Sequence, residues 1–121
     1  MAAGVTTLEI LRANPPYKAL GERAAYLMQE AQRAARKRGI PVYTTALGSL
    51  FTLFFSAKPV HNFEDAQGCD LNAFRRYFAA MLRAGIYLAP SQFEAGFLST
   101  AHTDEDIETT VRALDQALQS L

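Results

Sequence analysis

The sequence has few of the residues from which common active sites are built. It contains one cysteine, two histidines and no tryptophan. One cysteine excludes an internal disulfide, which suits a reducing compartment. Cys69 lies in a loop with no histidine near it in sequence, so we interpret it as a loop residue and not as a nucleophile. The short motifs for zinc, nucleotide phosphates and a serine nucleophile are absent as well. Residue spacing therefore reveals no complete active site and no metal site.

An excess of charge of one sign is also lacking. Twelve basic and twelve acidic residues give a formal net charge of zero. A neutral chain gives no electrostatic reason to expect nucleic acid or an anionic membrane as partner. Apolar runs fall far short of the ~20 residues of a membrane span, and the N-terminus lacks the charged start of a secretory signal. We therefore expect a cytoplasmic protein that contacts neither nucleic acid nor a membrane.

Length and hydrophobic periodicity predict a single α+β domain over residues 1–121. The chain is long enough for one hydrophobic core and too short for two. Helical spacing and β-prone runs indicate the order ααββαββα. We expect a two-layer sandwich, with helices on one face of a small, mainly antiparallel sheet of three to four strands. The helices are expected over residues 2–13, 16–38, 71–84 and from 103 onward, and the strands over residues 41–45, 50–56, 86–89 and 97–100.

The same spacing predicts which helix faces are buried. In the long helix the expected stripe begins at Tyr17 and ends at Ala35. In the helix over residues 71–84 the expected stripe is Leu71, Phe74, Phe78, Met81 and Leu82.

Two features indicate surfaces that meet something outside this chain. The first helix has no capping residue and begins at Met1, as if cut from a longer element. The strand over residues 50–56 is apolar on both faces, and a small domain can cover only one face with its own helices. We therefore expect an exposed apolar patch larger than the few hundred Å² of an ordinary monomer.

The most informative segment is residues 87–97, which places one carboxylate among apolar and small residues. Burying Glu94 alone would cost several kcal/mol, so it is either partnered or faces a polar cavity. Two interpretations stay open: Glu94 shapes a turn through backbone N–H groups, or it contacts a ligand. Ser91 and Gln92 can hydrogen-bond in the same cavity, although we favour Ser91 as a turn residue.

The lysines and histidines do not complete a site. Lys18 and Lys37 lie on or near the polar side of the long helix, and Lys58 lies in a turn, so none resembles a Schiff-base lysine. No glycine-rich loop leads into a helix N-terminus to hold a phosphate. His61 and His102 lie in loops and lack a second ligand at metal-binding spacing.

Four motifs in order resemble the glutamate-1-semialdehyde 2,1-aminomutase family of class III aminotransferases. They lie at residues 1–4 together with 7–9, at 48–55, at 85–97 and at 101–107. The run Pro-Ser-Gln-Phe-Glu-Ala-Gly-Phe is the most specific, and it favours the aminomutases over other class III aminotransferases. The chain resembles only the C-terminal domain of the family, and residues 1–13 resemble the helix that joins this domain to a missing large domain.

This resemblance implies a function for the full-length protein. It would be a fold type I pyridoxal-phosphate enzyme, a cytosolic homodimer that converts glutamate-1-semialdehyde to 5-aminolevulinate in tetrapyrrole (porphyrin) biosynthesis. The family's cofactor lysine and phosphate loop lie in the large domain, so the fragment alone is expected to bind no cofactor and to be inactive. Glu94 matches the family's active-site glutamate, and Ser91 and Gln92 are expected to support it.

Two alternatives remain open. The chain could be the C-terminal domain of another class III aminotransferase, because those domains share the fold. It could also be a stand-alone module that binds a small amine or amino acid at Glu94. A lysine-bearing large domain encoded immediately upstream would favour an enzyme, and an isolated gene would favour the module.

Overall fold

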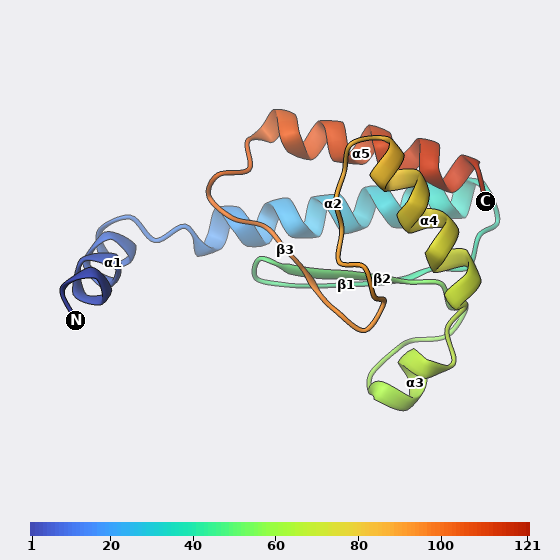
Figure 1. Ribbon diagram of the computed structural model, residues 1–121, viewed down its shortest axis with the longest axis horizontal. Coiled ribbons are helices and arrows are strands. Elements are labelled where there is room, and N and C mark those ends of the chain that lie inside the picture. The colour runs from blue at the N-terminus through green and yellow to red at the C-terminus, as the bar shows by residue number, and fades with distance from the viewer.

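The computed structural model describes residues 1–121 and confirms the predicted fold class (Figure 1). Five helices and three strands follow one another in the order α1 α2 β1 β2 α3 α4 β3 α5. The helices are α1 (Ala2–Ala13), α2 (Tyr17–Lys37), α3 (Phe63–Gln67), α4 (Leu71–Arg83) and α5 (Asp104–Gln119). The strands are β1 (Tyr43–Leu47), β2 (Leu50–Phe54) and β3 (Gly96–Phe97).

The sheet is antiparallel throughout, with β2 between β1 and β3. β1 and β2 form a hairpin in which Leu47 pairs with Leu50. Gly48 makes the turn with a φ of 56°, a conformation that glycine adopts without steric cost. β3 pairs with the start of β2, where Phe97 faces Leu50 across the ladder.

The prediction of a strand over residues 86–89 is wrong. The backbone N–H of Ile86 donates to the carbonyl of Met81 and so completes the end of α4. The chain then runs on without pairing with another strand. Ile86 and Leu88 nevertheless pack against the core, which explains why their apolar character resembled that of a strand. An apolar segment with a strand-like sequence can thus bury its side chains against the core without pairing with a strand.

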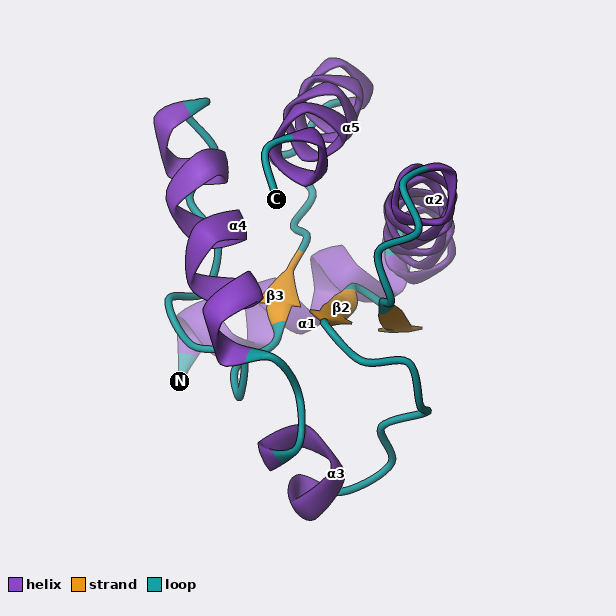
Figure 2. Ribbon diagram, turned by 90° about the vertical axis from the view of Figure 1, so that its right-hand side faces the viewer, coloured by secondary structure: helices purple, strands orange, loops and turns teal.

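Helices α2, α4 and α5 lie on one side of the sheet, as predicted (Figures 1 and 2). The two figures place α3 on the other side, beyond the end of β2. There Val60, Ala66 and Cys69 form a small cluster against Tyr43 and Phe54. The second face of the sheet is therefore covered at one end by this chain itself, whereas Leu50 near the other end stays 39% exposed.

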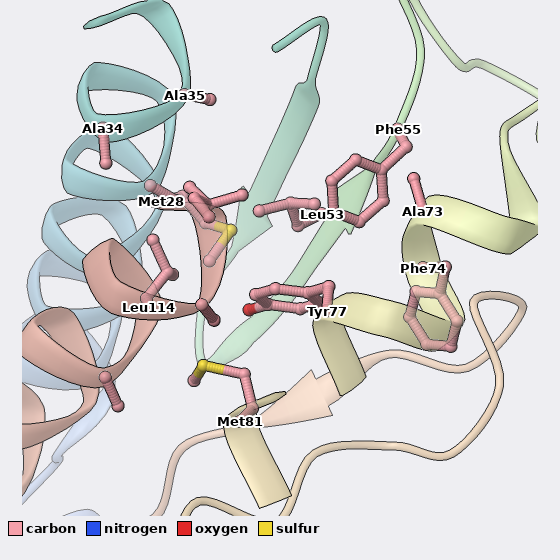
Figure 3. Close-up of a cluster of buried hydrophobic side chains, with 14 of the residues drawn as sticks. Met28, Ala34, Ala35, Leu53, Phe55, Ala73, Phe74, Tyr77, Met81 and Leu114 are labelled. Atoms are coloured by element: carbon pink, nitrogen blue, oxygen red, sulfur yellow. The ribbon is translucent and has the colours of Figure 1, made fainter. Parts of the chain in front are cut away.

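The core lies between β2 and the three helices on that side (Figure 3). Leu27, Met81, Leu114 and Leu118 are fully buried there. Figure 3 shows Met28, Leu53 and Tyr77 gathered around the centre of this cluster. Each such side chain contributes roughly 1.5–3 kcal/mol when removed from water, so this cluster is the main source of stability.

The buried stripe of α4 differs from the predicted one. Phe74 and Met81 are buried as expected, but Leu71 is 38% and Leu82 is 49% exposed, whereas Tyr77 is 4% exposed. Successive residues of a helix are separated by about 100° around its axis, so Leu82 points well away from Met81. Tyr17 is 62% exposed as well, because it lies in the first turn of α2, before the buried stripe begins at Leu20.

The ends of the helices follow the local sequence. The Asp70 carboxylate accepts hydrogen bonds from the N–H groups of Asn72 and Ala73 at the start of α4. Thr103 and Asp106 form a capping box at the start of α5. Gly85 follows α4 with a φ of 83°, which stops the helix.

Helix α1 stands apart from the rest of the molecule at the N-terminal end of α2 (Figure 1). None of its residues is buried, and Met1 before it provides no side-chain cap. Val5, Leu8 and Ile10 are 56%, 69% and 60% exposed. No helix of the chain combines the length and apolar character that crossing a membrane requires.

Candidate functional site

Glu94 lies in a tight turn of the segment that connects α4 to β3. Its backbone N–H donates to the carbonyl of Ser91 at 3.1 Å. The Ser91 hydroxyl accepts a hydrogen bond from the N–H of Phe93 at 3.2 Å. Ser91 therefore shapes the turn, the role the sequence favoured for it. The Glu94 side chain is exposed and belongs to none of the ion pairs of the chain.

Two adjoining hollows meet at Glu94. The larger holds about 480 Å³ and the smaller about 40 Å³. The larger is mainly apolar, and Glu94, His102 and Thr110 supply polar groups to it. Both hollows share one wall, formed by Phe51, Leu88, Ala89, Glu94 and Gly96. Glu94 is the only acidic residue lining either hollow, and neither hollow is lined by a lysine or an arginine.

His102 lines the larger hollow, which the sequence did not predict. Its Nδ1 accepts the backbone N–H of Ser99 at 3.0 Å and lies 3.1 Å from the Ser99 hydroxyl. Since Nδ1 is an acceptor, the neutral ring carries its proton on Nε2 and can donate from that atom. Residues 101–107 matched a family motif, but only the fold brings this loop beside the segment of Glu94. His61 instead lies against the ring of Tyr43, with a centroid distance of 6.2 Å.

Gln92 is buried, with 2% of its surface exposed. Its Nε2 donates to the carbonyl of Ala66 in α3 at 2.7 Å. Its Oε1 is buried and has no hydrogen-bond partner. Gln92 also lines the smaller hollow beside Glu94. Ser91, Gln92 and Glu94 therefore all line the smaller hollow. Ser91 shapes the turn, Gln92 is buried against α3, and Glu94 is exposed.

The thiol of Cys69 and the hydroxyl of Tyr77 are not activated groups. Cys69 is buried, and burial raises the pKa of its thiol, so the nucleophilic thiolate is disfavoured. Burial likewise raises the pKa of Tyr77, which borders the smaller hollow as a neutral phenol. No group of three or more histidine, cysteine, aspartate or glutamate residues is arranged to hold a metal ion.

No protein-family model matches this chain. The glutamate-1-semialdehyde 2,1-aminomutase of Geotalea daltonii is 44% identical over 121 residues, which is 100% of this chain and 28% of that protein. The aminomutase of Heliobacterium modesticaldum is 50% identical over 119 residues, or 98% of this chain and 27% of that protein. The chain matches the C-terminal part of glutamate-1-semialdehyde 2,1-aminomutases. The resemblance predicted from the four motifs is thereby confirmed, and the chain spans about 28% of the length of the aminomutases it matches.

Solved aminotransferases share the fold of this chain. An omega-transaminase from Sphaerobacter thermophilus superposes with a TM-score of 0.76 and 27% identity over 97% of this chain and 26% of that chain. The FumI protein of a Sphingopyxis species, solved in a pyridoxal-phosphate form, gives a TM-score of 0.75 and 28% identity over 98% of this chain and 26% of that chain. Pyridoxal phosphate is thus the cofactor of this FumI protein.

The residues of this chain do not by themselves fit pyridoxal phosphate. The cofactor needs an amine to which it can bond and cationic or N–H groups for its phosphate. Lys18 is 89% exposed and 3.8 Å from Glu22. Lys37 borders a separate hollow between α2 and α5, and Lys58 is an exposed residue just after β2. Apart from two tyrosines, the ionisable residues that line the two hollows are Glu94 and His102. Neither is an amine that could bond to the cofactor, so no reaction step on the cofactor can be derived from this chain.

Proposed function

We propose that residues 1–121 form the C-terminal domain of a glutamate-1-semialdehyde 2,1-aminomutase, with residues 1–13 joining it to a large domain. The whole enzyme is a cytoplasmic homodimer that converts glutamate-1-semialdehyde to 5-aminolevulinate in porphyrin biosynthesis. Identity of 44% to 50% with aminomutases along nearly the entire chain supports this assignment. Bound elsewhere in the enzyme, pyridoxal phosphate supplies the carbonyl group and the electron sink for amino-group transfer.

Glu94 carries the functional part of the proposal. It is the single acidic residue on both hollows, it is exposed, and no cation of this chain neutralises it. A carboxylate so placed can accept a hydrogen bond from an amino group of the substrate or hold its positive charge. Ser91 and Gln92 support Glu94 by shaping and holding its turn and have no direct contact with the substrate in this assignment.

A chimeric enzyme tests the assignment directly. This chain replaces the matching segment of the Geotalea daltonii aminomutase, and formation of 5-aminolevulinate from glutamate-1-semialdehyde is measured. We expect the chimera to be active and the separate chain to be inactive. A folded, cofactor-loaded chimera that accepts other amino donors but not glutamate-1-semialdehyde would instead indicate a different class III aminotransferase. Binding of a small amine or amino acid by the separate chain would support a stand-alone module.

A substitution in the chimera tests the role of Glu94. Glu94→Gln keeps the size of the side chain and removes its charge, so we expect kcat/KM to fall by about 10- to 100-fold through loss of a charge-assisted hydrogen bond. Glu105→Gln is a matched control, because Glu105 is exposed in the first turn of α5, away from both hollows. Equal activity of the Glu94→Gln chimera and the control would contradict the proposed role.

A further inference from the structure

Gln92 is the only buried polar or charged side chain of the chain, and it joins two segments that are far apart in sequence. The hydrogen bond from its Nε2 to the carbonyl of Ala66 spans 26 residues. The orientation of the amide follows from chemistry, because a carbonyl oxygen only accepts and must face the NH₂ group. The turn that carries Glu94 is therefore attached to α3 by a buried, short hydrogen bond of 2.7 Å.

A second contact connects the same two segments. The ring of Phe93, the residue before Glu94, packs against the ring of Phe63 at the start of α3, with centroids 5.4 Å apart. Such aromatic pairs contribute about 0.5–1.5 kcal/mol beyond the area they bury. Gln92 and Phe93 thus contact α3 from adjacent positions, which leaves little freedom for the turn that follows them.

Helix α3 is itself held in place. The side chain of Asn62 caps it by accepting the N–H of Asp65 at 2.9 Å. Ala66 packs with Val60 and Cys69 against the sheet. The five-residue helix is therefore a fixed support.

Stability alone does not explain a glutamine at position 92. Its Oε1 is buried without a partner, which costs roughly 1–3 kcal/mol. A methionine has a similar shape and would leave no side-chain acceptor unpaired in the same volume. What glutamine provides and methionine does not is a directional bond to Ala66. Unsatisfied buried polar groups of this kind are expected where position matters more than stability.

We propose that Gln92 is a positioning residue that clamps the Glu94 turn onto α3, so that α3 sets the place of the Glu94 carboxylate. The clamp is a property of this chain, whereas its catalytic consequence rests on the function proposed above for Glu94. Glu94 follows Gln92 by two residues, and a shift of about 1 Å at a reacting group can cost as much as 10²-fold in rate.

Amide exchange of the chain tests the clamp without any activity assay. In Gln92→Met we expect the amides of Phe93 and Glu94 to exchange about fivefold to tenfold faster, the effect of losing one hydrogen bond. The melting temperature should change little, because the unpaired Oε1 is lost together with the bond. Gln67→Met is the matched control, because it makes the same change of side chain at an exposed position of α3, next to Ala66. Unchanged exchange in Gln92→Met would overturn the proposal.

A pH-dependent rescue separates the hydrogen bond from simple packing. In Gln92→Glu an ionised carboxylate cannot donate to the Ala66 carbonyl, but a protonated carboxyl can. Protection of the Glu94 amide, relative to the native chain at the same pH, should therefore recover as the pH falls from about 8 to about 5. A ratio that stays constant over this range would show that packing, and not the hydrogen bond, holds the turn.

The chimera separates failure of the clamp from failure of the proposed function. There we expect Gln92→Met to lower kcat by about tenfold, and Gln67→Met to leave it unchanged. If the amides exchange faster in Gln92→Met while Glu94→Gln leaves the activity of the chimera unchanged, the clamp is supported and the proposed role of Glu94 is wrong. If the amides of Phe93 and Glu94 exchange at the native rate in Gln92→Met, the clamp proposal is wrong, whatever the activity of the chimera.

Discussion

The aromatic ring of Phe51 lies directly against the bare backbone of Gly96. The two residues are paired across β2 and β3, and a Cβ on Gly96 would come within 2.4 Å of the Phe51 Cζ. That distance is far below any normal contact, so only glycine permits this approach. Phe51 in turn packs against both the main core and the cluster around Leu20. The Phe51 ring thus connects β3, the strand that follows Glu94, to the hydrophobic core.

Gly96→Ala should therefore destabilise the domain. The added methyl group must push the Phe51 ring out of its position, and overpacking of this kind costs about 1–3 kcal/mol. Thermal unfolding measures the effect as a lower melting temperature. Gly4→Ala is the control, because nothing lies within 4 Å of its added Cβ and alanine favours an exposed helix. A melting temperature equal to that of the control would mean that the ring moves aside freely.

The capping box of α5 should contribute measurably to stability. The Thr103 hydroxyl accepts the N–H of Asp106, while the Asp106 carboxylate accepts the N–H of Thr103 at 2.7 Å. Loss of such a cap in Thr103→Ala should cost about 1 kcal/mol in chemical unfolding, and Thr103→Ser should retain most of it. Thr109→Ala is the control, because it also removes a threonine hydroxyl from this helix but only costs an exposed hydrogen bond that Arg112 donates to it at 2.8 Å, outside the cap.

Two aspartates, Asp106 and Asp115, are expected to make the domain less stable as the pH becomes acidic. Backbone and side-chain hydrogen bonds from Thr103 lower the pKa of Asp106, and the hydrogen bond from Arg38 lowers the pKa of Asp115. A lowered folded-state pKa means that the stabilisation is fully present above the ordinary value of 3.8 and is lost as the pH falls through the lower folded-state values.

Thermal unfolding at a series of pH values from about 5 to about 2 checks this dependence. The double variant Asp106→Asn with Asp115→Asn should be less stable at pH 5 and should lose less stability on acidification. Asp104→Asn is not a suitable control, because Arg23 contacts its carboxylate at 2.8 Å. Glu9→Gln, on the separate helix α1, is the better one. Parallel curves for the double variant and the native chain would contradict the assignment.

The separated chain should self-associate. Val5, Leu8 and Ile10 are more than half exposed on α1, a helix with no buried residue. Apolar surface left unpaired in this way favours association. We expect light scattering to report species larger than a monomer and a hydrophobic dye to bind. Val5→Gln with Leu8→Gln should reduce both signals, whereas Leu82→Gln, an exposed leucine of α4, should not. A strictly monomeric native chain without dye binding would count against this prediction.

The separated chain should also form no specific adduct with pyridoxal phosphate. Lys18, Lys37 and Lys58 lie outside both hollows at Glu94, so no lysine has the desolvated setting of a Schiff-base residue. Absorbance titration, borohydride reduction and mass spectrometry check this. Stoichiometric modification of one lysine would reverse the interpretation and indicate a self-sufficient cofactor-binding protein.

Local sequence determined helices α1, α2, α4 and α5, the N-terminal caps of α4 and α5, and the β1–β2 hairpin. Helical spacing, Asp70, Thr103 and the glycines at 39, 48 and 85 act within a few residues of themselves, so their effects could be predicted from sequence. The same signals could not show that residues 86–89 lack a strand partner. Whether an extended apolar segment joins a sheet depends on which edge is free, and β3 takes the edge of β2.

For the site, the sequence by itself determined the family resemblance and indicated Glu94 as the candidate site residue within residues 87–97. Only the tertiary structure decided what surrounds that carboxylate. It brought His102 to the same hollow from the loop before α5, and it placed Ala66 where Gln92 can bond to it across 26 residues. Contacts of this range arise from packing of whole elements, and no local pattern encodes them.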